Sequence, residues 1–194
     1  MNRLLTLGVI IMVAGCTRIY DTDEFKFQPS EDTASDGATT CQTYCETVMD
    51  VCVAENAQFA TAAQCMQICA YMIAGDTTDI SGNSLACRDH FALEAIESAG
   101  THCRSAGPGG NGVCGGNCES FCQLQNEICT GANVQFNSVE ACLSACATID
   151  DSVPYNNTIV SGNSLSCRLS HLSLASGSPD VHCSHLALDS PVCN

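Results

Sequence analysis

Large aromatic side chains are scarce in this sequence, which has no tryptophan, six phenylalanines and four tyrosines among 194 residues. Aromatic side chains supply much of the apolar area that a protein core buries. Without them, a folded unit of about 75 residues has a thin core and usually needs cross-links. The composition therefore predicts small domains that depend on covalent stabilisation.

Positive charge is scarce as well. Six Lys and Arg stand against 21 Asp and Glu, which gives a net charge of −15. Residues 41–194 contain no lysine and three arginines, Arg88, Arg104 and Arg168. An acidic surface of this kind repels polyanions. We therefore expect no nucleic-acid partner.

Motifs for catalysis and for thiol redox chemistry are also missing. The C-x2-C spacing of thioredoxin-like redox sites does not occur, nor does the C-x2-C-H spacing at which c-type haem is attached. No loop has the alternating oxygen ligands of a calcium site. We predict a protein that is not an enzyme and that has no cofactor.

Cysteine, by contrast, is abundant, with seventeen residues. Cys16 follows a short apolar leader, and the other sixteen form two octets of nearly equal spacing, in which five of the seven gaps are identical. The first octet is Cys41, Cys45, Cys52, Cys65, Cys69, Cys87, Cys103 and Cys114; the second is Cys118, Cys122, Cys129, Cys142, Cys146, Cys167, Cys183 and Cys193. Even octets predict that all sixteen form disulfides.

The octets belong to an internal duplication. The segment SGNSLACR at 81–88 matches SGNSLSCR at 161–168, and a His-Cys pair follows in each copy. We define repeat one as residues 40–115 and repeat two as residues 116–194; the second has a small insertion near Tyr155. They form either two small domains or one pseudo-symmetric pair.

The N-terminus has the features of a lipoprotein leader. Leu4 to Ala14 is an apolar run of about eleven residues, which is too short to span a bilayer but is typical of a secretory signal. The sequence Val13-Ala14-Gly15-Cys16 resembles the lipobox of bacterial lipoproteins. That resemblance implies a signal peptide over 1–15 and lipidation of Cys16.

The same resemblance implies a location. Thr17, rather than Asp, follows Cys16, which favours sorting to the outer membrane. Residues 16–39 are the lipidated cysteine and an acidic, small-residue segment that we expect to be a flexible tether. The expected partner is thus the membrane, through a lipid anchor, together with a protein or surface ligand. In such an oxidising compartment, cysteines form disulfides.

The cysteine spacing also predicts helices. Cys41, Cys45 and Cys52 fall on one face of a helix, and a second helix, capped by Thr61, carries Cys65 and Cys69. A third is expected to hold Cys87 and to stop at Gly100, with its counterpart stopping near Gly177. The fold class is therefore mostly α, with each repeat a helical hairpin, a third helix and a looped tail.

The two C-x3-C motifs of each hairpin resemble the twin C-x3-C hairpins of mitochondrial intermembrane-space proteins. The resemblance implies bridges Cys41–Cys69 and Cys45–Cys65. Those proteins lack the other four cysteines, so these stay unassigned, and eight cysteines allow 105 pairings.

Two sets of polar residues suggest alternatives to a purely structural reading. His102-Cys103 and His182-Cys183, with His90, His171 and His185 nearby, form a candidate metal or redox site, because zinc sites use Cys and His. His102 and His182 can instead cap helix carbonyls. The repeated Arg88 and Arg168 can bind an anion, clamp the repeats together, or contact carbonyls locally.

The repeat signature itself resembles a cysteine-rich motif of predicted secreted proteins and lipoproteins in predatory soil bacteria, a group of unknown function. That resemblance supports an oxidised, exported protein. We therefore expect a lipid-anchored envelope protein with a non-enzymatic binding, adhesion or structural role, and, as the alternative, a metal-binding or redox-active one.

Overall fold

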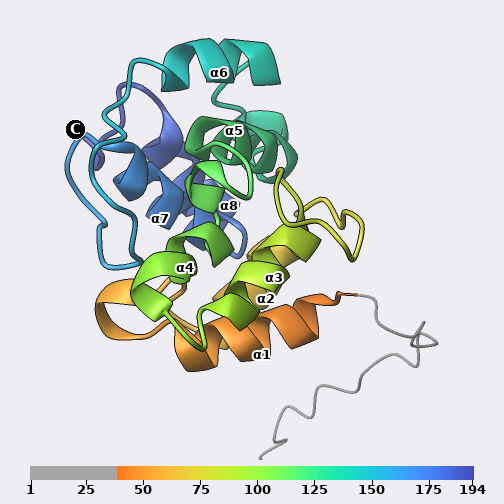
Figure 1. Ribbon diagram of the computed structural model, residues 1–194. Helices are drawn as coiled ribbons and strands as arrows, with labels where there is room; N and C mark the ends of the chain where they lie inside the picture. The colour runs from red at the N-terminus through yellow and green to blue at the C-terminus, as the bar shows by residue number, and fades with distance from the viewer. Residues whose placement is uncertain (1–38) are drawn as a thin grey trace, which may run out of the picture. The chain divides into compact units, whose positions relative to one another are not determined.

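The computed structural model describes residues 39–194, and the predicted leader, lipobox and most of the tether lie outside this range. Within it the fold is helical, as predicted, and no strand forms (Figure 1). Repeat one contains α1 (Cys41–Val51), α2 (Ala62–Cys69), α3 (Leu85–Glu94) and α4 (Ala99–Ala106), and repeat two contains α5 (Asn117–Ile128), α6 (Val139–Cys146), α7 (Leu165–Ala175) and α8 (Pro179–His182). Four short 3-10 turns join them: η1 (Ala54–Asn56), η2 (Gly110–Gly112), η3 (Gly131–Asn133) and η4 (Cys183–Leu186). None of these helices is long and apolar enough to cross a membrane.

Side-chain caps begin the second helix of each hairpin, as the sequence predicts, whereas α1 is capped by Thr40 and not by Thr39, the residue that the sequence suggests. The hydroxyl of Thr61 accepts a hydrogen bond from the amide of Gln64 at 3.1 Å, and Ser138 caps α6 in the same way at 3.2 Å. Such caps satisfy amide groups that would otherwise lack a partner at a helix start. Both copies of the second helix therefore start at the equivalent position of the repeat.

The third helix is shorter than the sequence predicts. Instead of continuing to Gly100, α3 ends at Glu94, and Gly100 lies in the first turn of a separate helix, α4. Repeat two breaks at the equivalent place, where Pro179 occupies the first turn of α8. Proline favours that position because its fixed φ suits a helix start and its missing N–H is not needed there.

All sixteen cysteines of the described residues form eight disulfides. The hairpin bridges are Cys41–Cys69 and Cys45–Cys65, the two implied by the twin C-x3-C resemblance, and their counterparts Cys118–Cys146 and Cys122–Cys142. The remaining cysteines pair identically in the two repeats, as Cys52–Cys103 and Cys87–Cys114, and as Cys129–Cys183 and Cys167–Cys193. Each repeat therefore has one bridge from the hairpin to the fourth helix, or in repeat two to Cys183 directly after it, and one from the third helix to the tail.

The two repeats pack against each other within one compact unit. Helix α2 of repeat one contacts α7 of repeat two. The insertion of repeat two supplies polar contacts, since the buried Tyr155 hydroxyl donates to the carbonyl of Gln58 at 3.0 Å and the amide of Asn157 donates to the carbonyl of Ala57 at 2.9 Å. The extra residues of the second copy thus contribute to the interface between the two copies.

Candidate functional site

The repeated SGNSLxCR segment builds the turn into the third helix. Gly82 and Gly162 adopt φ of +86° and +89°, a left-handed conformation that glycine tolerates best. Two residues later, the hydroxyls of Ser84 and Ser164 cap α3 and α7 by accepting from the amides of Cys87 and Cys167, each at 3.2 Å. These residues of the motif therefore have structural roles.

The two repeated arginines bind backbone carbonyls of the tail. Arg88 donates from Nε to the carbonyl of Gly107 at 3.1 Å and from a terminal nitrogen to that of Pro108 at 3.3 Å. Arg168 makes the same two contacts, with Ala187 and Leu188, at 3.2 Å each. Of the three roles suggested by the sequence, contact with local backbone carbonyls is therefore confirmed for both arginines.

Arg88 also joins the two repeats. One terminal nitrogen donates to the hydroxyl of Ser120 on α5 at 2.9 Å and to the side chain of Asn83 at 2.7 Å. Arg88 is 1% exposed, and burial lowers its pKa to about 10. Because its donors are committed to these buried partners, Arg88 clamps the repeats and is closed to an external anion.

The metal set suggested by the His-Cys pairs is not formed. Cys103 is bridged to Cys52 and Cys183 to Cys129, so neither sulfur is a free thiolate. Zinc binds cysteine as the thiolate. His102 stacks on the ring of Phe91, with the ring centres 5.6 Å apart.

Repeat two instead gathers three histidines, from α7, α8 and η4, into one cluster. Nδ1 of His171 lies 3.2 Å from Nδ1 of His182 and 3.1 Å from Nδ1 of His185. One ligand nitrogen from each of the three lies within 4.8 Å of the others. We call His171, His182 and His185 the histidine cluster. All three histidines are candidates from the sequence, but its His-Cys pattern pairs His182 with Cys183 and places His171 and His185 only nearby. The spacing of His182 and His185, one helical turn apart, is the signal for a site built from histidines.

The cluster is partly withdrawn from solvent. His171 is 6% exposed, and His182 and His185 are half-buried. Burial lowers the pKa of His171, as does the neighbouring His185, although a hydrogen bond to Val160 acts in the opposite direction. Burial and the two other histidines lower the pKa of His182. Uncharged imidazole, the form that binds metals, is therefore favoured at these two positions.

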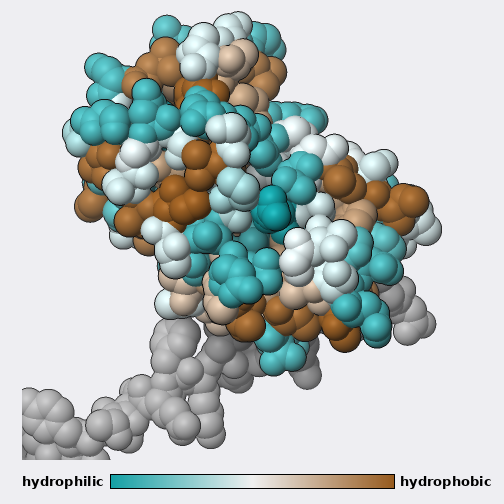
Figure 2. Space-filling model, turned by 60° about the vertical axis from the view of Figure 1, so that its left-hand side comes forward, coloured by the Kyte–Doolittle hydropathy of each residue, from teal (hydrophilic) through white to brown (hydrophobic). Residues whose placement is uncertain are grey.

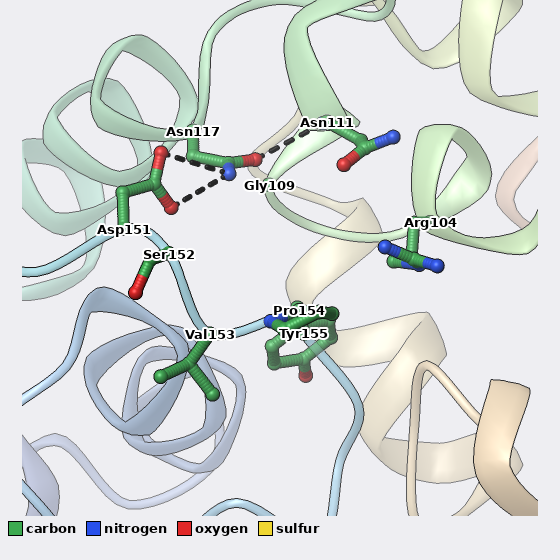
Figure 3. A pocket seen from close by; sticks show the side chains of 9 residues that line it. All are labelled: Arg104, Gly109, Asn111, Asn117, Asp151, Ser152, Val153, Pro154 and Tyr155. Atoms are coloured by element: carbon green, nitrogen blue, oxygen red, sulfur yellow. Dashed lines mark hydrogen bonds between the residues drawn. The ribbon is translucent and has the colours of Figure 1, made fainter.

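Two hollows lie between the repeats. A polar pocket of about 110 Å³ has Arg104 of α4 on one side and Asp151 on the other, with the Asp151 carboxylate held by the amide of Asn117 at 2.9 and 3.1 Å (Figure 3). Its volume suits a few water molecules and is below the roughly 300 Å³ typical of small-molecule sites. A second, open hollow has a volume of about 260 Å³. Thr61 and Gln67 of repeat one line one side of it, and Ser178 and His182 of repeat two line the other.

Comparison with known proteins identifies the family. The model of the BfoA family C-terminal domain matches twice, at residues 17–119 and 116–190. A protein of Acanthamoeba polyphaga mimivirus described as EGF-like domain-containing is 32% identical over 75 residues, which is 38% of this chain and 14% of that protein. No solved structure matches the chain. The two matches together span most of the sequence, and the chain therefore belongs to the BfoA family, of whose C-terminal domain it carries two copies.

Proposed function

We propose that this protein is a lipid-anchored, extracytoplasmic binding module without enzymatic activity. The observation that carries the proposal is the complete pairing of the cysteines of both repeats into eight bridges. So many disulfides indicate an oxidising, extracytoplasmic location. The remaining cysteine, Cys16, is the one that the Val13-Ala14-Gly15-Cys16 pattern marks for lipidation.

The anchor and the acidic segment after it would hold the two repeats near a membrane surface. Two or more acyl chains anchor a protein stably, whereas one alone binds weakly. Thr17 after the lipidated cysteine supports the outer membrane as the destination. The carboxylates of the folded body then disfavour contact with anionic head groups, so that its surface stays available to other ligands.

The exposed surface suits a binding or adhesion role rather than a buried reaction site. On the face shown in Figure 2, hydrophobic residues lie in small groups separated by hydrophilic ones. Repeat one exposes several large apolar side chains, among them Ile80, Ile96 and Leu93 at 62%, 60% and 51%. Exposed apolar side chains among carboxylates favour a protein or surface ligand that is neutral or basic.

The test is expression of the full chain in a Gram-negative host with labelled palmitate. We expect the wild type to take up label, to partition into detergent and to fractionate with the outer membrane, and Cys16→Ser to lose all three properties. Thr17→Asp is the matched variant for sorting and should keep the label but move to the inner membrane. A wild type that is released without lipid, or a Cys16→Ser variant that is still labelled, would refute the anchor.

A further inference from the structure

We propose that His171, His182 and His185 form a binding site for one divalent transition-metal ion, with Zn²⁺ the ion that suits it best. The site lies in repeat two, where α7, α8 and η4 meet, and it is separate from the lipid anchor and from the tail-binding arginines. Its donors are three imidazole nitrogens, which suit zinc, copper or nickel rather than calcium or magnesium.

The two nitrogen–nitrogen distances from His171 are close to those between ligands around zinc. Zinc binds histidine nitrogen at about 2.0–2.1 Å with tetrahedral geometry, which places two ligand nitrogens about 3.3–3.4 Å apart. The Nδ1 atoms of His182 and His185 lie 3.2 and 3.1 Å from that of His171. The ligand nitrogens of all three residues lie within 4.8 Å of one another, so that one ion between them is within reach of the half-buried His182 and His185.

The hydrogen bonds of His171 leave its Nδ1 available as a ligand. Its other nitrogen, Nε2, lies 3.1 Å from the carbonyl oxygen of Val160 and donates to it, because a carbonyl can only accept. Nδ1 of His171 then carries a lone pair, and this single lone pair faces two further ring nitrogens. A backbone carbonyl that orients a histidine in this way is the usual second partner of a metal ligand.

Repeat one shows that the fold does not require these histidines. At the position equivalent to His171 it has Phe91, which stacks on His102 with ring centres 5.6 Å apart and an angle of 27° between the ring planes. The rings of His171 and His182 are arranged almost identically, with centres 5.4 Å apart and an angle of 30°. At the position of His185 it has Ser105. The duplicated framework thus folds with one histidine here, and repeat two places three of the chain's five histidines at these positions.

The neighbouring sulfur atoms do not complete the site. Cys167 and Cys193 lie close to His171 but are bridged to each other. Three protein ligands leave a fourth position on the ion, which in zinc proteins is taken by water or by a bound molecule. His182 also lines the hollow of about 260 Å³ between the repeats, which offers a route for such a molecule.

The test is titration of the full chain, solubilised in detergent with all disulfides intact, with Zn²⁺ against a chromophoric chelator. We expect one ion per chain in the wild type. His171→Phe and His185→Ser introduce the residues that repeat one has at these positions. Each should weaken zinc binding by about 100-fold or more, because loss of a residue that only supports a metal ligand already costs about 10- to 100-fold in metal affinity. His102→Ala, the matched change in repeat one, should leave the affinity unchanged. Added Co²⁺ should give the visible spectrum of a tetrahedral nitrogen site in the wild type and in His102→Ala, but not in the other two variants.

Two results would overturn the proposal. One is a wild-type protein that has no free thiols, so that all eight disulfides are intact, and that binds no zinc at micromolar zinc concentration. The other is zinc binding of equal affinity in the wild type, His171→Phe and His185→Ser, because the ion would then be held elsewhere. Because the replacements are native to the framework of repeat one, we expect both variants to fold, and a non-reduced mass equal to that of eight bridges checks this.

Discussion

The bridge from the hairpin to the fourth helix should contribute more to stability than the inner hairpin bridge. Cys52 and Cys103 are 51 residues apart, and both are buried. In the entropy model, a disulfide stabilises the fold by restricting the unfolded chain, and a loop of this length is worth about 4 kcal/mol. Replacing both cysteines by alanine should lower the free energy of unfolding by that amount.

The other bridges change this estimate little for Cys52–Cys103 but substantially for Cys45–Cys65. With the remaining bridges of repeat one intact, the shortest covalent path from Cys52 to Cys103 is still about 40 residues long. Cys45–Cys65, in contrast, lies inside the loop that Cys41–Cys69 closes, so it restricts only about ten additional residues and is worth about 3 kcal/mol. The two double-alanine variants should therefore differ by about 1 kcal/mol.

Guanidinium unfolding followed by circular dichroism, under non-reducing conditions, measures the difference. Both variants remove one buried disulfide and leave similar small cavities, so each serves as the control for the other. Both should also show a larger dependence of unfolding free energy on denaturant, because their unfolded states are less restricted. Equal losses, or a larger loss for the Cys45–Cys65 variant, would refute the loop-length argument.

Three further changes test other contacts. Arg88→Met should lower the free energy of unfolding by about 2–4 kcal/mol in a urea titration, because the carbonyls of Gly107 and Pro108 lose a buried donor. Tyr155→Phe should cost about 1 kcal/mol and speed amide exchange at the interface between the repeats, because the bond to Gln58 is lost. In chelator, the metal-free protein should be less stable at pH 5 than at pH 7.5: burial lowers the pKa of His171 in the folded state, so the unfolded chain binds the proton first as pH falls through about 6.5.

Each of these has a matched control. Arg104→Met, at a half-exposed arginine of the same repeat, should cost little, and a cost equal to that of Arg88→Met would contradict the clamp. Tyr44→Phe removes a buried bond to Ala106 within repeat one and should not speed exchange at the interface. His171→Phe should reduce the loss of stability at pH 5, because it removes the histidine whose pKa burial lowers.

Short-range patterns in the sequence were sufficient to predict the hairpin helices. The i, i+4 spacing of Cys41 and Cys45 and the cap at Thr61 depend on contacts within one or two helical turns. Such contacts form in the same way wherever the helix packs. The predicted stop at Gly100 is wrong for α3, because Gly100 lies in the first turn of the next helix; Pro179 at the equivalent break in repeat two marks the boundary.

The histidine cluster was only partly visible in the sequence. His182 and His185 are one turn apart and could be paired from spacing alone, but His171 lies on a different helix. What brings α7 and the segment of His182 together is the packing of the tail, which the bridges of Cys183 and Cys193 secure. One of these bridges uses Cys183, and Cys52–Cys103 uses Cys103, which are the two cysteines that the sequence offered as metal ligands.

The sequence by itself therefore determined the duplication, the helical class and the even set of cysteines, because each depends on composition or on residues close in the chain; the lipid anchor stays a prediction from the leader. Only the tertiary structure decided which distant cysteines pair outside the hairpins, that Arg88 and Arg168 bind carbonyls 19 and 20 residues away, and that three histidines meet in repeat two. These outcomes depend on how helices pack across a loop, and residue spacing does not specify that packing.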